Sequence, residues 1–195
     1  GYALIDFDYT GVDEKLLTCI TLPTREKNED YGLLYTRKGT NVFTTLTELK
    51  SAYKLGAKIT IHTGIKFNLY TIADDKKYPL ALLFKDLINK RNQYKKGSPE
   101  NKFWKLVANS ITGKIGQGLK HKRVYSYNAA EMDEIPQSKI TSPPYIVEIT
   151  SLGRTIITEV MNCFILEGWE IINVVTDGFL ARSPEDKVIT ENDIN

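Results

Sequence analysis

The stretch that decides the fold is KLVANSITGK, from Lys105 to Lys114. It predicts a helix, because Lys105, Asn109 and Gly113 follow one another at i, i+4 and therefore share one face. Ala108 and Thr112 lie beside this stripe. We expect the helix to pack its apolar side and to present a flat, small-residue face that can receive a planar group, with an anion near Lys105. The opposite, apolar side carries Phe103, Leu106, Val107 and Ile111.

This stretch resembles the Lys-x-x-x-Asn-Ser-x-Tyr-Gly motif of family B DNA polymerases. In that family the helix belongs to the fingers, its lysine contacts the triphosphate of the incoming nucleotide, and its small residues line the nascent base pair. The resemblance implies that Lys105 binds the triphosphate and that Asn109, Ser110 and Gly113 shape the nucleotide face. Thr112 replaces the usual tyrosine, so the resemblance implies nothing about sugar or base selection. An amphipathic helix with an exposed lysine is the alternative interpretation.

A second segment, from Ile171 to Ala181, resembles the Asp-Thr-Asp-Ser motif of the same family. There an apolar β-hairpin carries a metal-binding carboxylate into the palm. Asp177 aligns with the second aspartate, which implies that Asp177 is a catalytic metal ligand in a two-magnesium site. Val175 replaces the first aspartate and Gly178 the serine. Asp-Gly between two apolar runs is also a hairpin signal, so a turn residue is the alternative for Asp177.

A third, looser match lies between the first two. The segment from Ile149 to Arg154 resembles the Ile-Thr-x-x-x-Arg segment that precedes the aspartate hairpin in the family. The pattern also predicts a helix with Thr150 or Ser151 as its N-cap, running to Gly168. The order of the three segments is that of the family, which favours the polymerase interpretation.

The expected fold class is α+β, with an antiparallel palm sheet, packed helices and an α-helical fingers hairpin. Residues 1–72 form a β-rich palm-side segment with strands at 2–9, 16–22, 32–36 and 58–63 and a capped helix from Thr45 to Gly56. Residues 73–118 form the fingers hairpin, in which a helix over 78–96 is followed by Ser98 as N-cap and Pro99 at N1 of the motif helix. Arg91 projects from the first helix as an implied phosphate-binding cation. Residues 119–195 form a palm segment with a strand at 123–127 and the aspartate hairpin.

Composition sets limits on function. The chain has 195 residues, 42% hydrophobic and 26% charged, which is ordinary for a folded domain. No apolar run approaches the roughly 20 residues of a membrane span, and we expect no membrane partner. The net charge of +2 says little about nucleic acid. Basic residues crowd the middle of the chain, which suits a phosphate backbone or is simply a solvated helix face. They are Lys85, Lys90, Arg91, Lys95, Lys96, Lys102, Lys105, Lys114, Lys120, Lys122 and Arg123.

The few cysteines and histidines indicate no metal or nucleophile chemistry. Cys19 and Cys163 have neither zinc nor disulfide spacing, and we expect both to be buried thiols in a reducing compartment. His62 lies in an alternating strand and is interpreted as structural. Localisation is expected to be cytoplasmic, in the replication of a phage, plasmid or other mobile element, with an organelle as the alternative.

The family's first catalytic motif, Asp-x-x-Ser-Leu-Tyr-Pro, does not occur in this sequence. Asp6 and Asp8 lie on a plausible strand but lack the turn that follows the motif. We therefore expect the motif to lie upstream of Gly1 and the fragment to be inactive alone. The resemblance implies template-directed DNA synthesis by the parent polymerase, with Mg²⁺, a DNA primer–template, a deoxynucleoside triphosphate and, in protein-primed members, a terminal protein. The alternatives are a non-catalytic nucleic-acid-binding module derived from a polymerase and a protein-interaction domain.

Overall fold

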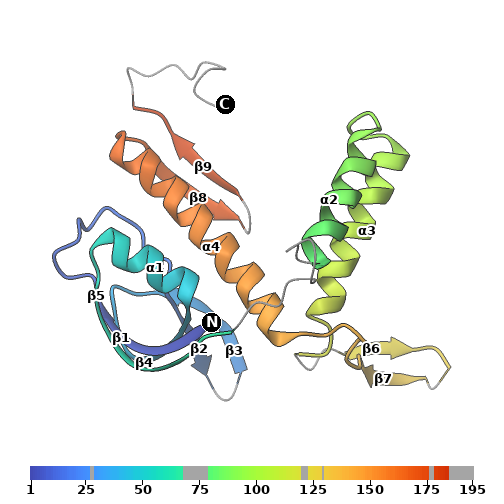
Figure 1. Ribbon diagram of the computed structural model, residues 1–195, viewed down its shortest axis with the longest axis horizontal. Coiled ribbons are helices and arrows are strands. Elements are labelled where there is room, and N and C mark those ends of the chain that lie inside the picture. Colours follow the sequence, from blue (N-terminus) through green and yellow to red (C-terminus); the bar gives the residue numbers. More distant parts are fainter. Residues whose placement is uncertain (27–28, 68–78, 120–122, 129, 176–177, 185–195) are drawn as a thin grey trace, which may run out of the picture. The chain divides into compact units, whose positions relative to one another are not determined.

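The computed structural model describes residues 1–26, 29–67, 79–119, 123–128, 130–175 and 178–184 (Figure 1). The chain divides into two compact units. One joins Gly1–Lys66 to Glu148–Asn195, and the other is Phe67–Val147. Helices and antiparallel strands occur in both, as the predicted α+β class requires.

The first unit is built on a three-stranded antiparallel sheet of order β4-β1-β5. Its central strand, β1 (Tyr2–Asp8), is flanked by β4 (Lys38–Thr45) and β5 (Lys58–Ile65). Alternation along β1 turns one set of side chains into the core and leaves the other set half-exposed, as its sequence predicts. The core set consists of Ala3, Ile5, Phe7 and, just beyond the strand, Tyr9.

A two-stranded hairpin follows, formed by β2 (Thr21–Glu26) and β3 (Glu29–Tyr35). The strand expected at 16–22 is wrong for residues 16–20. At Leu17, the side-chain amide of Asn162 makes the hydrogen bonds that a neighbouring strand would make. Its Oδ1 accepts from the Leu17 N–H at 2.7 Å, and its Nδ2 donates to the Leu17 carbonyl at 3.0 Å. A side chain distant in sequence therefore satisfies the Leu17 N–H and carbonyl, which a β-ladder would otherwise pair.

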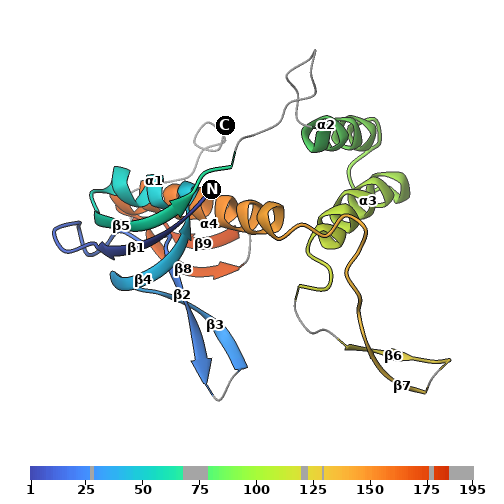
Figure 2. The ribbon, with the colours of Figure 1, turned by 60° about the horizontal axis from the view of Figure 1, so that its bottom comes forward.

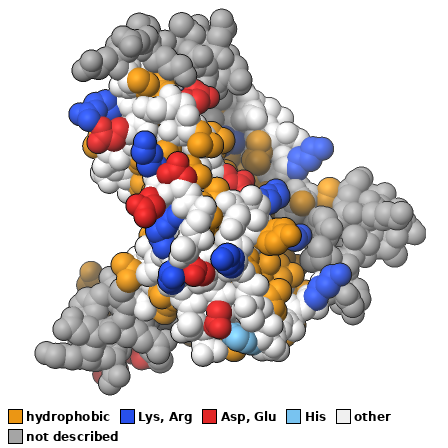
Figure 3. Space-filling model, turned by 90° about the vertical axis from the view of Figure 1, so that its left-hand side faces the viewer, with side chains coloured by type: hydrophobic (Ala, Val, Ile, Leu, Met, Phe, Trp, Pro, Cys, Tyr) orange, Lys and Arg blue, Asp and Glu red, His pale blue; other side chains and the backbone are white. Residues whose placement is uncertain are grey.

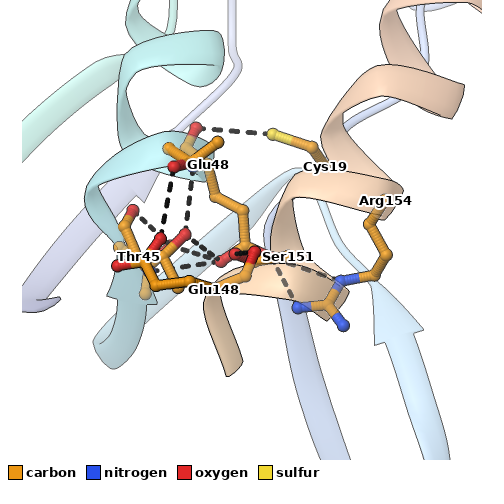
Figure 4. A network of polar contacts seen from close by, with 8 residues as sticks. Cys19, Thr45, Glu48, Glu148, Ser151 and Arg154 are labelled. Carbon is orange, nitrogen blue, oxygen red and sulfur yellow. Dashed lines mark hydrogen bonds and ion pairs between the residues drawn. The ribbon is translucent and has the colours of Figure 1, made fainter. Parts of the chain in front are cut away.

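Helix α1 (Leu46–Leu55) begins with the predicted capping box. Thr45 Oγ1 accepts from the Glu48 N–H, and Glu48 Oε2 accepts from the Thr45 N–H, both at 3.2 Å. Gly56 ends the helix at a φ of 100°, which a residue with a Cβ adopts only with strain. Cys19 lies against this helix and donates to the Glu48 carbonyl (Figure 4). Burial raises the pKa of the Cys19 thiol, whereas Cys163 is exposed, so the expectation of two buried thiols is wrong for Cys163.

Helix α4 (Pro143–Leu166) starts earlier than the expected cap at Thr150 or Ser151, because prolines are compatible with a first helical turn. Its buried face is polar and its exposed face is apolar. The buried residues include Ser151, Thr155, Thr158 and Asn162, and the exposed ones include Leu152, Ile156 and Val160.

By length and composition α4 is apolar enough to cross a membrane, which contradicts the expectation that no run approaches that length. The same helix makes polar contacts with the rest of its unit, however. Arg154 forms an ion pair with the buried Glu48 (Figure 4). Glu159 accepts from Ser51 at 2.7 Å. These are the contacts of a helix that packs in a folded core.

The hairpin of β8 (Glu170–Val175) and β9 (Gly178–Arg182) follows α4 and confirms the hairpin expected near Asp177. Phe164, near the end of α4, makes edge-on ring contacts with Trp169 at 5.2 Å and with Phe179 at 5.3 Å. The hairpin is therefore anchored to α4 by aromatic packing.

The second unit contains the predicted helical hairpin, formed by α2 (Pro79–Asn92) and α3 (Pro99–Ile115) (Figures 1 and 2). The first helix ends at residue 92, four residues earlier than expected. Ser98 is the N-cap of α3, with its Oγ accepting from the Asn101 N–H, and Pro99 occupies the first turn as predicted. Leu87 of α2 and Ile115 of α3 are buried. A small hairpin of β6 (Arg123–Ser126) and β7 (Glu131–Glu134) completes the unit.

Candidate nucleotide-binding site

The polar stripe predicted along α3 is present and accessible. Lys105, Asn109, Ser110 and Gly113 are all exposed. A Cβ built on Gly113 meets no atom within 4 Å, so the surface above this glycine is open. The Thr112 hydroxyl donates back to the Ala108 carbonyl at 3.4 Å, which keeps it on the helix. The resulting face is exposed and carries Lys105 in its N-terminal half.

The apolar side of α3 is less buried than its sequence predicts. Phe103 and Leu106 remain more than half exposed, and Leu106 lines a groove of about 300 Å³ with Val107, Ser110, Ile111, Lys114 and Ile140. The expectation that this side packs is therefore wrong within the described residues. The buried residues of α3 are instead Asn101 and Ile115, at the two ends of the helix.

Arg91 is attached to the stripe by a residue that sequence analysis missed. Asn101 is 7% exposed, its Nδ2 donates to the Arg91 carbonyl at 3.1 Å, and its Oδ1 accepts from Arg91 Nε at 3.5 Å. Asn101 precedes Lys105 by four residues, so the residue that contacts Arg91 lies one helical turn before Lys105 on the same face of α3. The signal that could have found Asn101 is the i−4 extension of the stripe.

The expected metal ligand, Asp177, lies outside the described residues. Val175, at the end of β8, is exposed, and the motif resemblance places the family's first aspartate at this position. Among the described residues no group of three or more His, Cys, Asp or Glu side chains is placed to hold a metal ion. The described residues therefore do not fit the two-magnesium site that the resemblance implies.

Asp6 and Asp8 do not supply the missing ligands, because each is already engaged. Asp6 pairs with His62 at 2.9 Å and accepts from the Asn41 N–H at 2.8 Å. The hydrogen bond from His62 is the main cause that lowers the pKa of Asp6. Asp8 accepts from the Thr10 N–H at 2.7 Å, and hydrogen bonding by Thr10 lowers the pKa of Asp8 to about 2. The contact with Asp6 agrees with the structural role expected of His62.

Charge does not mark a single nucleic-acid surface on the face that Figure 3 shows. Lys and Arg side chains there are interspersed with Asp and Glu and with apolar patches. A surface that binds a phosphate backbone has an excess of positive charge, which this face lacks.

The chain was compared with known proteins. It is 31% identical over 192 residues to the primer-independent DNA polymerase PolB of Escherichia coli, a match that covers 96% of this chain and 21% of that polymerase. Its fold is similar to that of phi29 DNA polymerase in an orthorhombic crystal form, with a TM-score of 0.60 and 14% identity, over 96% of this chain and 32% of the other. No family model matches the chain. It spans about a fifth of the length of the polymerase it matches in sequence, and its similarity to a segment of that DNA polymerase agrees with the resemblance that its motifs indicate.

Proposed function

We propose that the protein containing this chain carries out template-directed DNA synthesis, and that the α2–α3 hairpin is its fingers element. In the reaction, a primer 3′-hydroxyl attacks the α-phosphate of a deoxynucleoside triphosphate and pyrophosphate leaves in line. The observation that carries the proposal is the exposed stripe of Lys105, Asn109 and Gly113 on α3. Homology to a DNA polymerase over nearly the whole chain supports it.

The residues of α3 have separate tasks in this proposal. Lys105 neutralises the triphosphate, as a compact ammonium suited to a cluster of phosphate oxygens. Asn109, Ser110 and Gly113 shape the surface against which the nucleotide lies, and Arg91 adds a second cation. These groups bind and orient the substrate, which contributes to catalysis by holding the reacting atoms in place.

Asp177 is the magnesium ligand in this proposal, and the described residues form no group of carboxylates or histidines that could complete the site. We accordingly expect the 195-residue chain by itself not to extend a primer. The proposed partners are a DNA primer–template, a deoxynucleoside triphosphate and, where priming uses a protein, a terminal protein. The proposed location is the cytoplasm, during replication of a mobile element.

The test is magnesium-dependent primer extension by the full-length protein. Lys105→Ala should raise the KM for the nucleotide about tenfold, because loss of a charged contact to phosphate costs about 1.5 kcal/mol or more. Asp177→Asn should abolish extension. Lys54→Ala, an exposed lysine at the end of α1, serves as the matched control and should leave extension unchanged. Full activity of Asp177→Asn would refute the assignment of Asp177.

A second candidate function is a non-catalytic nucleic-acid-binding module. The exposed Val175 at the position of an aspartate favours it. In that case neither the full-length protein nor its variants extend a primer, yet primer–template binding persists and weakens steeply with added salt.

A further inference from the structure

We propose that Asn101 is a positioning residue for nucleotide binding. It holds the Arg91 guanidinium at the N-terminal end of the α3 stripe, so that Arg91 and Lys105 bind the same triphosphate. The inference rests on the proposed function. It names Asn101 as the residue that contacts Arg91, one of the two basic residues, Lys90 and Arg91, in the last turn of α2.

Asn101 is held rigidly by contacts at its backbone and at both ends of its side chain. Its backbone N–H donates to the N-cap Ser98 Oγ at 3.2 Å. Its Nδ2 donates to the carbonyl of Arg91 in the last turn of α2, which also accepts from the Tyr94 N–H at 3.2 Å. Its Oδ1 accepts from Arg91 Nε. The opposite orientation of the amide would set an NH₂ group against the Arg91 Nε–H, so the two contacts agree on one orientation.

The contact at Nε leaves the outer part of the Arg91 guanidinium available. Its two terminal NH₂ groups have no protein partner in the part of the chain that the structure describes. Lys105 lies four residues beyond Asn101, about 6 Å further along the helix axis. A guanidinium held beside Asn101 and an ammonium one helical turn further along can bind successive phosphate groups of one triphosphate. A guanidinium also binds phosphate oxygens in a bidentate manner.

Lys90, the other cation in this turn, is engaged elsewhere. Its Nζ pairs with Asp86 at 2.8 Å and lies 5.2 Å from the centre of the Trp104 ring. Asn101 contacts Arg91 and not Lys90, so the structure distinguishes these two adjacent basic residues by their contacts. Lys90 is therefore the matched control for Arg91.

A double-mutant cycle in the full-length polymerase tests this inference. The KM for the complementary deoxynucleoside triphosphate is measured at saturating primer–template for Arg91→Ala, Asn101→Leu and the double variant. Arg91→Ala should raise KM about tenfold, since it removes a charged contact, and Asn101→Leu several-fold, with kcat changed less than KM. The double variant should be no worse than Arg91→Ala alone, because Asn101 acts through Arg91. Lys90→Ala should leave KM unchanged.

The outcomes separate this inference from the proposed function. A wild-type protein that does not extend primers refutes the proposed function itself. If Lys105→Ala raises KM and Arg91→Ala does not, the function stands and the role of Asn101 is overturned. Multiplying effects in the double variant would also overturn it, because they are the mark of independent structural damage. If Asn101→Leu fails to fold, Asn101→Ser, whose hydroxyl is too short to reach Arg91, takes its place in the same cycle.

Discussion

Replacing Arg154 by methionine should destabilise the first unit by removing the partner of a buried carboxylate. Arg154 Nη2 and Nε lie 2.6 and 3.2 Å from Glu48 Oε1, and the Glu48 side chain is only 5% exposed. Leaving one member of a buried ion pair without its partner costs about 3–5 kcal/mol. Thr44 and Thr45 still donate to the other oxygen of Glu48, so we expect a loss near the lower end, about 3 kcal/mol. That loss corresponds to a fall in Tm of about 6–12 °C.

Thermal unfolding followed by Trp169 fluorescence, in a Trp104→Phe background, reports on the unit that contains this pair. Arg182→Met is the matched control, because Arg182 forms an exposed ion pair with Glu170 in the same unit, and such pairs contribute less than about 1 kcal/mol. The double replacement of Glu48 by glutamine and Arg154 by methionine should lose less stability than Arg154→Met, since it leaves no buried charge and glutamine retains an acceptor for the capping box. A loss in Arg154→Met no larger than that in Arg182→Met would refute the reasoning.

Two further predictions concern a pair of glycines and the acid limb of stability. Gly118→Ala should destabilise the second unit by about 1–3 kcal/mol, because Gly118 has a φ of 74° and a Cβ there would lie 2.6 Å from the Gln137 backbone nitrogen. Gly113→Ala, in open space on α3, should instead stabilise by about 0.5–1 kcal/mol in calorimetry while raising the nucleotide KM. The pKa of Asp8 is lowered from 3.8 to about 2, so its carboxylate stabilises the fold at pH values above 3.8. This stabilisation is lost as the pH falls toward 2. In Asp8→Asn, the Tm should therefore decrease less between about pH 4 and pH 2 than it does in the wild type. The same decrease in both proteins would contradict the lowered pKa of Asp8.

The α3 face could be predicted from sequence because its residues are placed by one helix. The i, i+4 spacing of Lys105, Asn109 and Gly113 needs only helical geometry, and Ser98 with Pro99 marks where that helix begins. Arg91 was predicted only as a cation on the preceding helix. Its contact with Asn101 was not foreseeable, because it depends on how two helices pack across a connection. Asp177 stays a prediction, since it lies outside the described residues.

The sequence by itself determined the elements whose hydrogen bonds close within a few residues. These include the capping box of Thr45 and Glu48 and the hairpin of β8 and β9. The alternation along β1 was also predictable, because it follows the period of a strand, although the strands that pair with β1 are distant in sequence. Only the tertiary structure decided that the polar face of α4 would be buried, with Arg154 reaching a glutamate 106 residues away. It also decided that Asn162 would replace a strand beside Leu17. The physical reason is that a local pattern specifies which backbone groups pair nearby, whereas a buried polar side chain is stabilised by whichever distant partner the packed chain brings to it.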